Sequence, residues 1–232
     1  MTVAGSIRPS TRLGAATDRV AGCCRDFTLL TVAALRARGV PARSRVGFAA
    51  YFAPGFHHDH VITEYWNGER WVFADTEIAQ RNGPWSEFDP LDLPLGETAF
   101  ETAAQVWTRF RRGELDVDRY GVAPDLPLRG AWFVRNYVIQ ELAHRQRDEL
   151  LLWDTWGEMS LQLDGDLGLI DEIACLLLAA DRGEEVAERE LAARYAADAR
   201  LHPGDRVLSY SPCGVTETVD LRLRDLVRSP VG

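Results

Sequence analysis

Hydrophobic positions near the start of the chain follow a helical period. In the segment CRDFTLLTVAALRARG, which starts at Cys24, apolar residues recur at roughly helical spacing and good helix formers fill the gaps. Gly39 and Pro41 then supply a stop signal. The pattern therefore predicts a helix that begins at Cys24.

The period changes to two after this helix. Residues 42–52 place apolar side chains at alternate positions, which predicts a strand that ends before Pro54. Two further β-rich runs, HVITEYW and ERWVFADTE, are separated by the pair Asn67 and Gly68, the strongest short signal for a hairpin. With a two-residue loop, His60 lies opposite Asp75, as Glu64 does opposite Trp71 and Trp66 opposite Glu69.

The second half of the chain is mainly helical in pattern. Proline and acidic residues over 81–97 predict an ordered surface loop that buries Trp85 and Phe88. The remaining expectations are a short helix near 15–20, helices near 98–112, 130–147 and 168–199, a strand at 206–211 and a last helix at 221–228.

Composition narrows the class of protein. The 232 residues are 46% hydrophobic and 26% charged, which is typical of a globular protein. The net charge of −9 argues against a nucleic-acid binder that uses a broad basic surface. No run is long and apolar enough to predict a membrane span or a secretion signal, so a cytoplasmic protein without a membrane or nucleic-acid partner is expected. Four cysteines are too few for a disulfide scaffold, and all four are interpreted as thiols.

Three residues carry candidate chemistry. Cys24 opens the first helix, where free N–H groups and the helix dipole lower the pKa of a thiol. In the two-residue hairpin register, Asp75 faces His60 and can orient its imidazole ring. The sequence therefore predicts a nucleophile, a base and an orienting carboxylate in Cys24, His60 and Asp75.

This order of residues resembles the transglutaminase-like superfamily of cysteine enzymes. The resemblance rests on CRDF, ALRARGVPARSRVGF, DHVITEYW and RWVFAD, and covers residues 23–76. It implies an α+β, papain-like core with a nucleophile helix packed on an antiparallel sheet. We expect the catalytic core over 1–125 and a mainly helical extension over 126–232, where GAWFVRNYVIQELAHR and LLLWDTWGEM look like the extension of some bacterial members.

The resemblance implies acyl transfer from a peptide or small-molecule amide through a thioester on Cys24, with hydrolysis preferred over transfer to an amine. We expect no cofactor and no metal, because Cys24, His60 and Asp75 already supply the nucleophile, the base and the orienting carboxylate. Two departures stand out. Val61 and Ile62 follow His60, where the family often has an aromatic residue. The 22 residues before Cys23 contain no Gln, Asn or Trp to donate to an oxyanion, so a second donor is left open among Ser, Thr, Arg25 and the backbone.

Two other readings of the same residues stay open. One is a catalytically silent module that keeps the fold and binds a partner. The other is a thiol or metal-binding protein that uses Cys23, Cys24 and the histidine cluster His57–His60, although no CxxC or HExxH spacing supports it.

Overall fold

A computed structural model describes residues 22–79 and 88–222 of the chain. The expected helix near 15–20, all but the first two residues of the one near 221–228, and the part of the loop that precedes Phe88, with Trp85, fall outside these residues. Within them, no helix is long and apolar enough to cross a membrane.

The main sheet is antiparallel along its principal path. Its strands run in the order β3 (Trp71–Ala74), β2 (Phe56–Trp66), β1 (Ala42–Ala53) and β4 (Phe100–Thr102). The two-residue strand β5 (Tyr120–Gly121) adds in parallel to the start of β2, at His57 and His58. β2 therefore pairs with β5 at one end and with β3 at the other.

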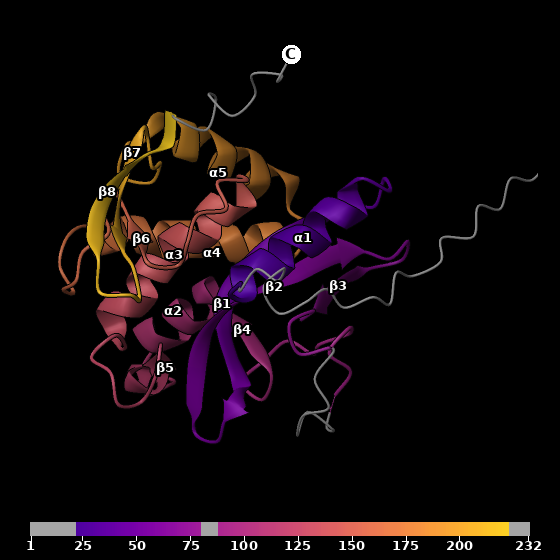
Figure 1. The fold of residues 1–232 in the computed structure, drawn as a ribbon. Helices are drawn as coiled ribbons and strands as arrows, with labels where there is room; N and C mark the ends of the chain where they lie inside the picture. The colour runs from indigo at the N-terminus through magenta and orange to yellow at the C-terminus, as the bar shows by residue number, and fades with distance from the viewer. Residues whose placement is uncertain (1–21, 80–87, 223–232) are drawn as a thin grey trace, which may run out of the picture.

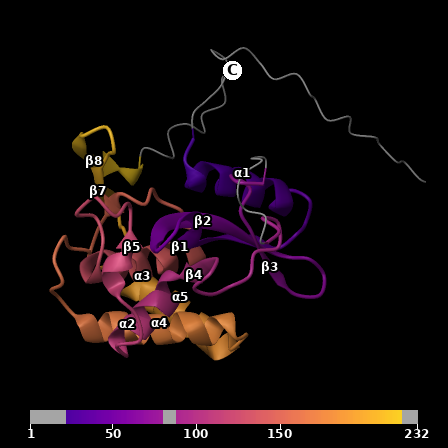
Figure 2. The ribbon, with the colours of Figure 1, turned by 90° about the horizontal axis from the view of Figure 1, so that it is seen from below.

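Helix α1 (Cys24–Arg36) packs on β2 and β1, as predicted from its period. In Figure 2 it lies on one side of β2, and the later helices lie on the other. Both faces of the central strand β1 are consequently covered, and its residues from Ser44 to Ala49 are all buried. The alternation of apolar residues over 42–52 correctly predicted the strand. It predicted burial of one face only, whereas both faces are buried.

The β2–β3 hairpin differs from its predicted register. Trp66 pairs with Trp71 and Glu64 with Phe73, so four residues, 67–70, form the loop. The reason lies in Asn67, whose side-chain oxygen accepts hydrogen bonds from the backbone N–H groups of residues 69 and 70, both at 2.9 Å. The Trp66 and Trp71 rings also pack edge to face across the strands. The predicted pairs of Glu64 with Trp71 and Trp66 with Glu69 are therefore wrong by two residues.

The second half of the described chain forms helices and a small sheet, coloured from magenta to yellow in Figure 1. The helices are α2 (Ala103–Arg111), α3 (Ala131–Arg145), α4 (Leu167–Asp181) and α5 (Glu185–Ala197), with a 3₁₀ turn, η2, at Val117–Arg119. The small antiparallel sheet contains β6 (Asp154–Thr155), β7 (Arg206–Tyr210) and β8 (Thr216–Asp220).

Two of the predicted helices need correction. The helix expected near 98–112 begins only at Ala103, because residues 100–102 pair with β1 and Thr102 caps the helix by accepting from the Gln105 N–H. The region 168–199 contains two helices, which part at Gly183, a glycine with a φ of +87°. The helix at 130–147 and the strand at 206–211 are confirmed.

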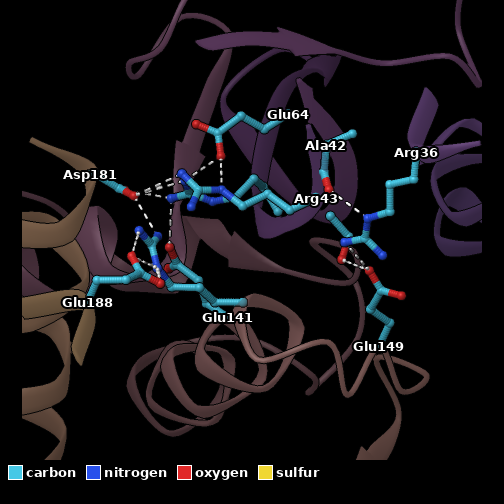
Figure 3. A network of polar contacts seen from close by, with 11 residues as sticks. Arg36, Ala42, Arg43, Glu64, Glu141, Glu149, Asp181 and Glu188 are labelled. Carbon is cyan, nitrogen blue, oxygen red and sulfur yellow. Dashed lines mark hydrogen bonds and ion pairs between the residues drawn. The ribbon is translucent and has the colours of Figure 1, made fainter. Parts of the chain in front are cut away.

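One hydrophobic cluster joins the sheet to the later helices. It contains Val46 and Phe48 of β1 with Tyr137 of α3 and Leu177 of α4, and Cys24 packs against it. A smaller cluster around Ile62 and Phe73 takes in Phe88 at its edge, as the sequence predicted. Ion pairs also link the sheet to α3 and α4: Arg45 of β1 pairs with Glu141 of α3 and Asp181 of α4 as well as with Glu64 of β2, and Figure 3 labels these three carboxylates.

Candidate active site

Cys24 is the first residue of α1, and Cys23 is its N-cap. The Cys23 N–H donates to the Asp26 carboxylate at 3.1 Å, which closes the first turn. The Asp26 N–H donates to the Cys23 carbonyl at 2.9 Å, whereas the N–H of Cys24, at the first helical position, has no carbonyl one turn earlier in the helix to donate to. The backbone N–H of Cys24 is therefore one candidate donor to an oxyanion.

His60 and Asp75 are hydrogen-bonded, at 2.7 Å between Nε2 and Oδ2. His60 lies in β2, and Asp75 follows directly after β3. The predicted contact is present even though the register is shifted, because a slip of two residues leaves a side chain on the same face of a sheet. Both side chains are buried.

Tyr51 is a third member of this group that the sequence did not reveal. Its hydroxyl donates to Asp75 Oδ2 at 2.7 Å. Burial raises the pKa of Asp75, but hydrogen bonds from His60 and Tyr51 outweigh it and hold this pKa below its ordinary value. Asp75 is therefore a carboxylate that can hold the His60 ring with Nε2 protonated and Nδ1 available as a base.

The Cys24 thiol lies beside His60. Its sulfur, a ring nitrogen of His60 and a carboxylate oxygen of Glu77 are all within 4.8 Å of one another. The thiol also accepts a hydrogen bond from the backbone N–H of Val61, and Thr28 of the same helix donates to the Val61 carbonyl at 2.9 Å. Side chains of α1 thus provide hydrogen-bond partners for the backbone of β2 at Val61, which lies between the residues that pair with β5 and those that pair with β3.

The two adjacent thiols differ in acidity, and in the opposite sense from the sequence prediction. The hydrogen bond with Cys23 and burial raise the pKa of Cys24 well above its usual value, and the Asp59 carboxylate adds to this. The hydrogen bond with Cys24 and the helix N–H groups lower the pKa of Cys23 to about 6. The Cys24 thiol therefore holds its proton more tightly than an ordinary cysteine does, and it needs a base such as His60 to become a nucleophile.

Aromatic rings from β1 enclose His60. The centroid of Phe52 is 4.9 Å from that of the His60 ring, and Tyr51 lies at 6.1 Å, both edge to face. β1 is irregular here, since its register with β2 shifts between Ala49 and Ala53. This wall takes the place of the aromatic residue that the sequence lacks after His60.

Arg25, one of the possible second donors to an oxyanion, is already engaged in other hydrogen bonds. Both Nε and Nη2 of Arg25 donate to the Glu149 carbonyl, at 2.9 and 2.5 Å, and Nη1 donates to Asp26. The Arg25 guanidinium is thus used to join α1 to the loop after α3.

Of the histidine cluster His57–His60, His60 lies beside the Cys24 thiol, whereas His57 and His58 contact other residues. His57 stacks on Tyr120 with 4.2 Å between ring centroids, and Nδ1 of His58 bonds the Val122 carbonyl at 2.8 Å. Over residues 22–79 and 88–222, the one group of three side chains able to hold a metal ion is Cys24, His60 and Glu77.

A cavity of about 520 Å³ adjoins the thiols on the side of the later helices. Cys23, Cys24 and Asp59 line it from the core, and residues between 122 and 161, with Tyr210 and Pro212, form the rest. A volume of this size suits a small organic ligand or a single large side chain. Sequence analysis missed the cavity, because its walls lie more than a hundred residues apart along the chain.

Comparison with known protein families gives one match, and it covers the part of the chain that contains Cys24, His60 and Asp75. Residues 8–76 match the model of the transglutaminase-like superfamily. No curated protein and no solved structure matches the chain.

Proposed function

We propose that the chain is a cysteine enzyme of the transglutaminase-like superfamily, whose family model matches residues 8–76, and that it cleaves an amide through a thioester on Cys24. The observation that carries the proposal is the buried relay from the Cys24 thiol to His60 and from His60 to Asp75. His60 is proposed as the general base and acid, and Asp75 as the residue that orients it.

The proposed reaction begins when a substrate carbonyl lies against the Cys24 thiol. His60 takes the thiol proton as the sulfur attacks the carbonyl carbon, and the Cys24 N–H donates to the oxyanion that forms. The C–N bond then breaks, and His60 gives the proton to the leaving amine. The products of this half-reaction are a free amine and a thioester on Cys24.

Water completes the reaction in the hydrolytic form that we propose. His60 accepts a proton from the water molecule as its oxygen attacks the thioester, and the Cys24 sulfur leaves and is protonated again. An amine in place of water would give transfer instead of hydrolysis. We favour hydrolysis because water is always available to an open thioester.

A small activated acyl ester, 4-nitrophenyl acetate, tests the proposal when the intact mass of the protein is measured. The wild-type protein should gain one acetyl group that then turns over, and Cys24→Ala should not. Cys23→Ala is the matched control and should still form the adduct. Because the more acidic Cys23 can react without catalysis, the adduct must also be lost in His60→Ala. Acetylation and turnover that persist at the wild-type rate in both Cys24→Ala and His60→Ala would overturn the proposal.

A second candidate rests on the closeness of Cys24, His60 and Glu77, whose side chains are zinc ligands in many proteins. If the protein uses a metal ion, a chelator should abolish turnover and zinc should restore it. If it is a cysteine enzyme, the chelator should leave turnover unchanged and added zinc should inhibit, because zinc would occupy the thiol and the base.

A further inference from the structure

The thiol lies between two different environments. Asp59 and His60 are neighbours in β2, so their side chains point to opposite faces of the sheet. His60 meets Asp75 and Tyr51 on one face. Asp59 meets Tyr137 of α3 on the other, where the Tyr137 hydroxyl donates to Oδ2 at 2.5 Å.

The cavity lies on the Asp59 side. Cys24 and Asp59 line it, whereas His60 and Asp75 do not. In the proposed reaction the leaving amine must be near His60 to receive a proton. The part of the substrate that extends into the cavity is therefore the acyl part, which stays on the sulfur.

The walls of this cavity combine apolar surface with negative charge. Aromatic and aliphatic side chains dominate, among them Trp132, Phe133, Leu152, Trp153 and Met159. Asp59 and Asp154 are the charged groups among the described residues that line it, and no arginine or histidine joins them. Such a site favours a group that is apolar and carries a positive charge.

Asp59 lies close to the reacting atoms. Asp59, Tyr137 and Cys24 all line the same cavity, and Asp59 directly precedes His60 in β2. A cation bound by Asp59 must therefore be close to the scissile carbonyl. An amine on the carbon next to the carbonyl meets this condition.

We propose that the substrate is an amide of an α-amino acid with a large apolar side chain, whose protonated α-amine pairs with Asp59 while the side chain occupies the cavity. This inference rests on the proposed function and names its substrate class. It also gives the substrate a part in catalysis. Asp59 raises the pKa of Cys24, so a cation beside Asp59 removes this effect and makes the thiol easier to ionise once the substrate is bound.

The test compares two chromogenic amides that differ in one group. The 4-nitroanilide of phenylalanine carries the α-amine, and the 4-nitroanilide of 3-phenylpropanoic acid lacks it. At pH 6.5 the first should have a kcat/KM about 10- to 100-fold higher, the size expected for a hydrogen bond to a charged group. Asp59→Asn should reduce this ratio to about two, and Glu185→Gln, which removes an exposed carboxylate on α5, should leave it unchanged.

A second measurement needs only the wild-type protein. The preference for the phenylalanine amide should decline as the pH rises through about 8, where the α-amine loses its proton. A ratio near one in the wild type, or a ratio that does not depend on pH and survives Asp59→Asn, would overturn the inference.

Labelling with chloromethyl ketones of the same two acyl groups separates this inference from the function on which it rests. The thiol displaces chloride and the adduct is located by mass spectrometry. Faster labelling of Cys24 by the phenylalanine reagent supports the inference. Equal labelling of Cys24 by both reagents overturns the substrate class alone, and failure of both to label Cys24 overturns the proposed function with it.

Discussion

Two groups of buried polar side chains border the main sheet, and they differ in how completely they are paired. Around Arg45, every charge has an opposite charge in contact. The guanidinium reaches Glu64 and Glu141 at 3.0 Å and Asp181 at 2.6 Å, and Arg145 also binds Asp181, at 2.7 Å. The members of this group come from β1, β2, α3 and α4 (Figure 3). None of them lines the cavity beside Cys24.

The group around His60 is smaller and incomplete. The Asp75 carboxylate is well paired, by His60, Tyr51 and the N–H of Glu77. The Cys24 thiol at the other end of the relay borders a cavity and keeps its proton. Buried charge therefore does not distinguish a site from a structural network here. What distinguishes the site is a reactive group that has a base beside it and space for a substrate.

The largest effect that we expect is the loss of stability when Arg45, at the centre of the paired group, is replaced. Arg45→Met keeps most of the side-chain volume but removes the arginine that pairs with the buried Glu141 and one of the two arginines at each of Glu64 and Asp181. We expect the free energy of unfolding to fall by about 3–5 kcal/mol, measured by denaturant titration. Arg38→Met, at an exposed position of the same residue type, is the control. A loss below about 1 kcal/mol would show that the network contributes little, and acylation of Cys24 in the folded variant should persist.

Asp181 tests the same network through pH. Arg45 and Arg145 outweigh its burial and lower its pKa to about 2. Because this pKa is below the value of about 3.9 in the unfolded chain, the carboxylate stabilises the fold above pH 4, and this stabilisation is lost as the pH falls through 2. Asp181→Asn should cost about 1.5–3 kcal/mol at pH 6 and flatten the decline of unfolding free energy between pH 4 and 2. An unchanged pH profile in the variant would contradict the assignment.

In the group around His60, replacement of the buried carboxylate Asp75 should lower activity and leave stability largely unchanged. Asp75→Asn keeps the shape of the side chain but favours the wrong tautomer of His60, so kcat/KM should fall about 10- to 100-fold. The effect is smaller than in a serine enzyme because a thiol ionises more readily. Asp92→Asn, an exposed carboxylate, serves as the control. Activity within about twofold of wild type would remove Asp75 from the mechanism.

Several features of the site could be predicted from short segments of the sequence. The start of α1 at Cys24, the strand over 42–52 and the pairing of His60 with Asp75 all follow from the period of the sequence. The hairpin prediction was wrong in register yet correct in face. Strand alternation has a period of two, and the side chain of Asn67 lengthened the loop by two residues.

The remaining features depend on contacts that no local pattern contains. The predicted acidity of Cys24 considered only the helix start, whereas the hydrogen bond with Cys23, burial and the Asp59 carboxylate raise the pKa of this thiol. Tyr51 reaches Asp75 through an irregularity in β1. The Arg45 network joins residues up to 136 positions apart, so its arginine and its carboxylates look like ordinary charges in the sequence.

Tyr51 gives the smallest effect and the sharpest distinction between a positioning role and simple packing. Tyr51→Phe keeps the ring that borders His60 and removes one hydrogen bond to Asp75. We expect kcat/KM to fall about two- to tenfold, in line with one hydrogen bond to a charged group. That bond lowers the pKa of Asp75, so its loss raises this pKa, and the acidic limb of the pH profile should move to higher pH. A reduced rate with an unmoved acidic limb would mean that Tyr51 only packs against His60, whereas a shift in the limb ties the hydroxyl to the charge on Asp75.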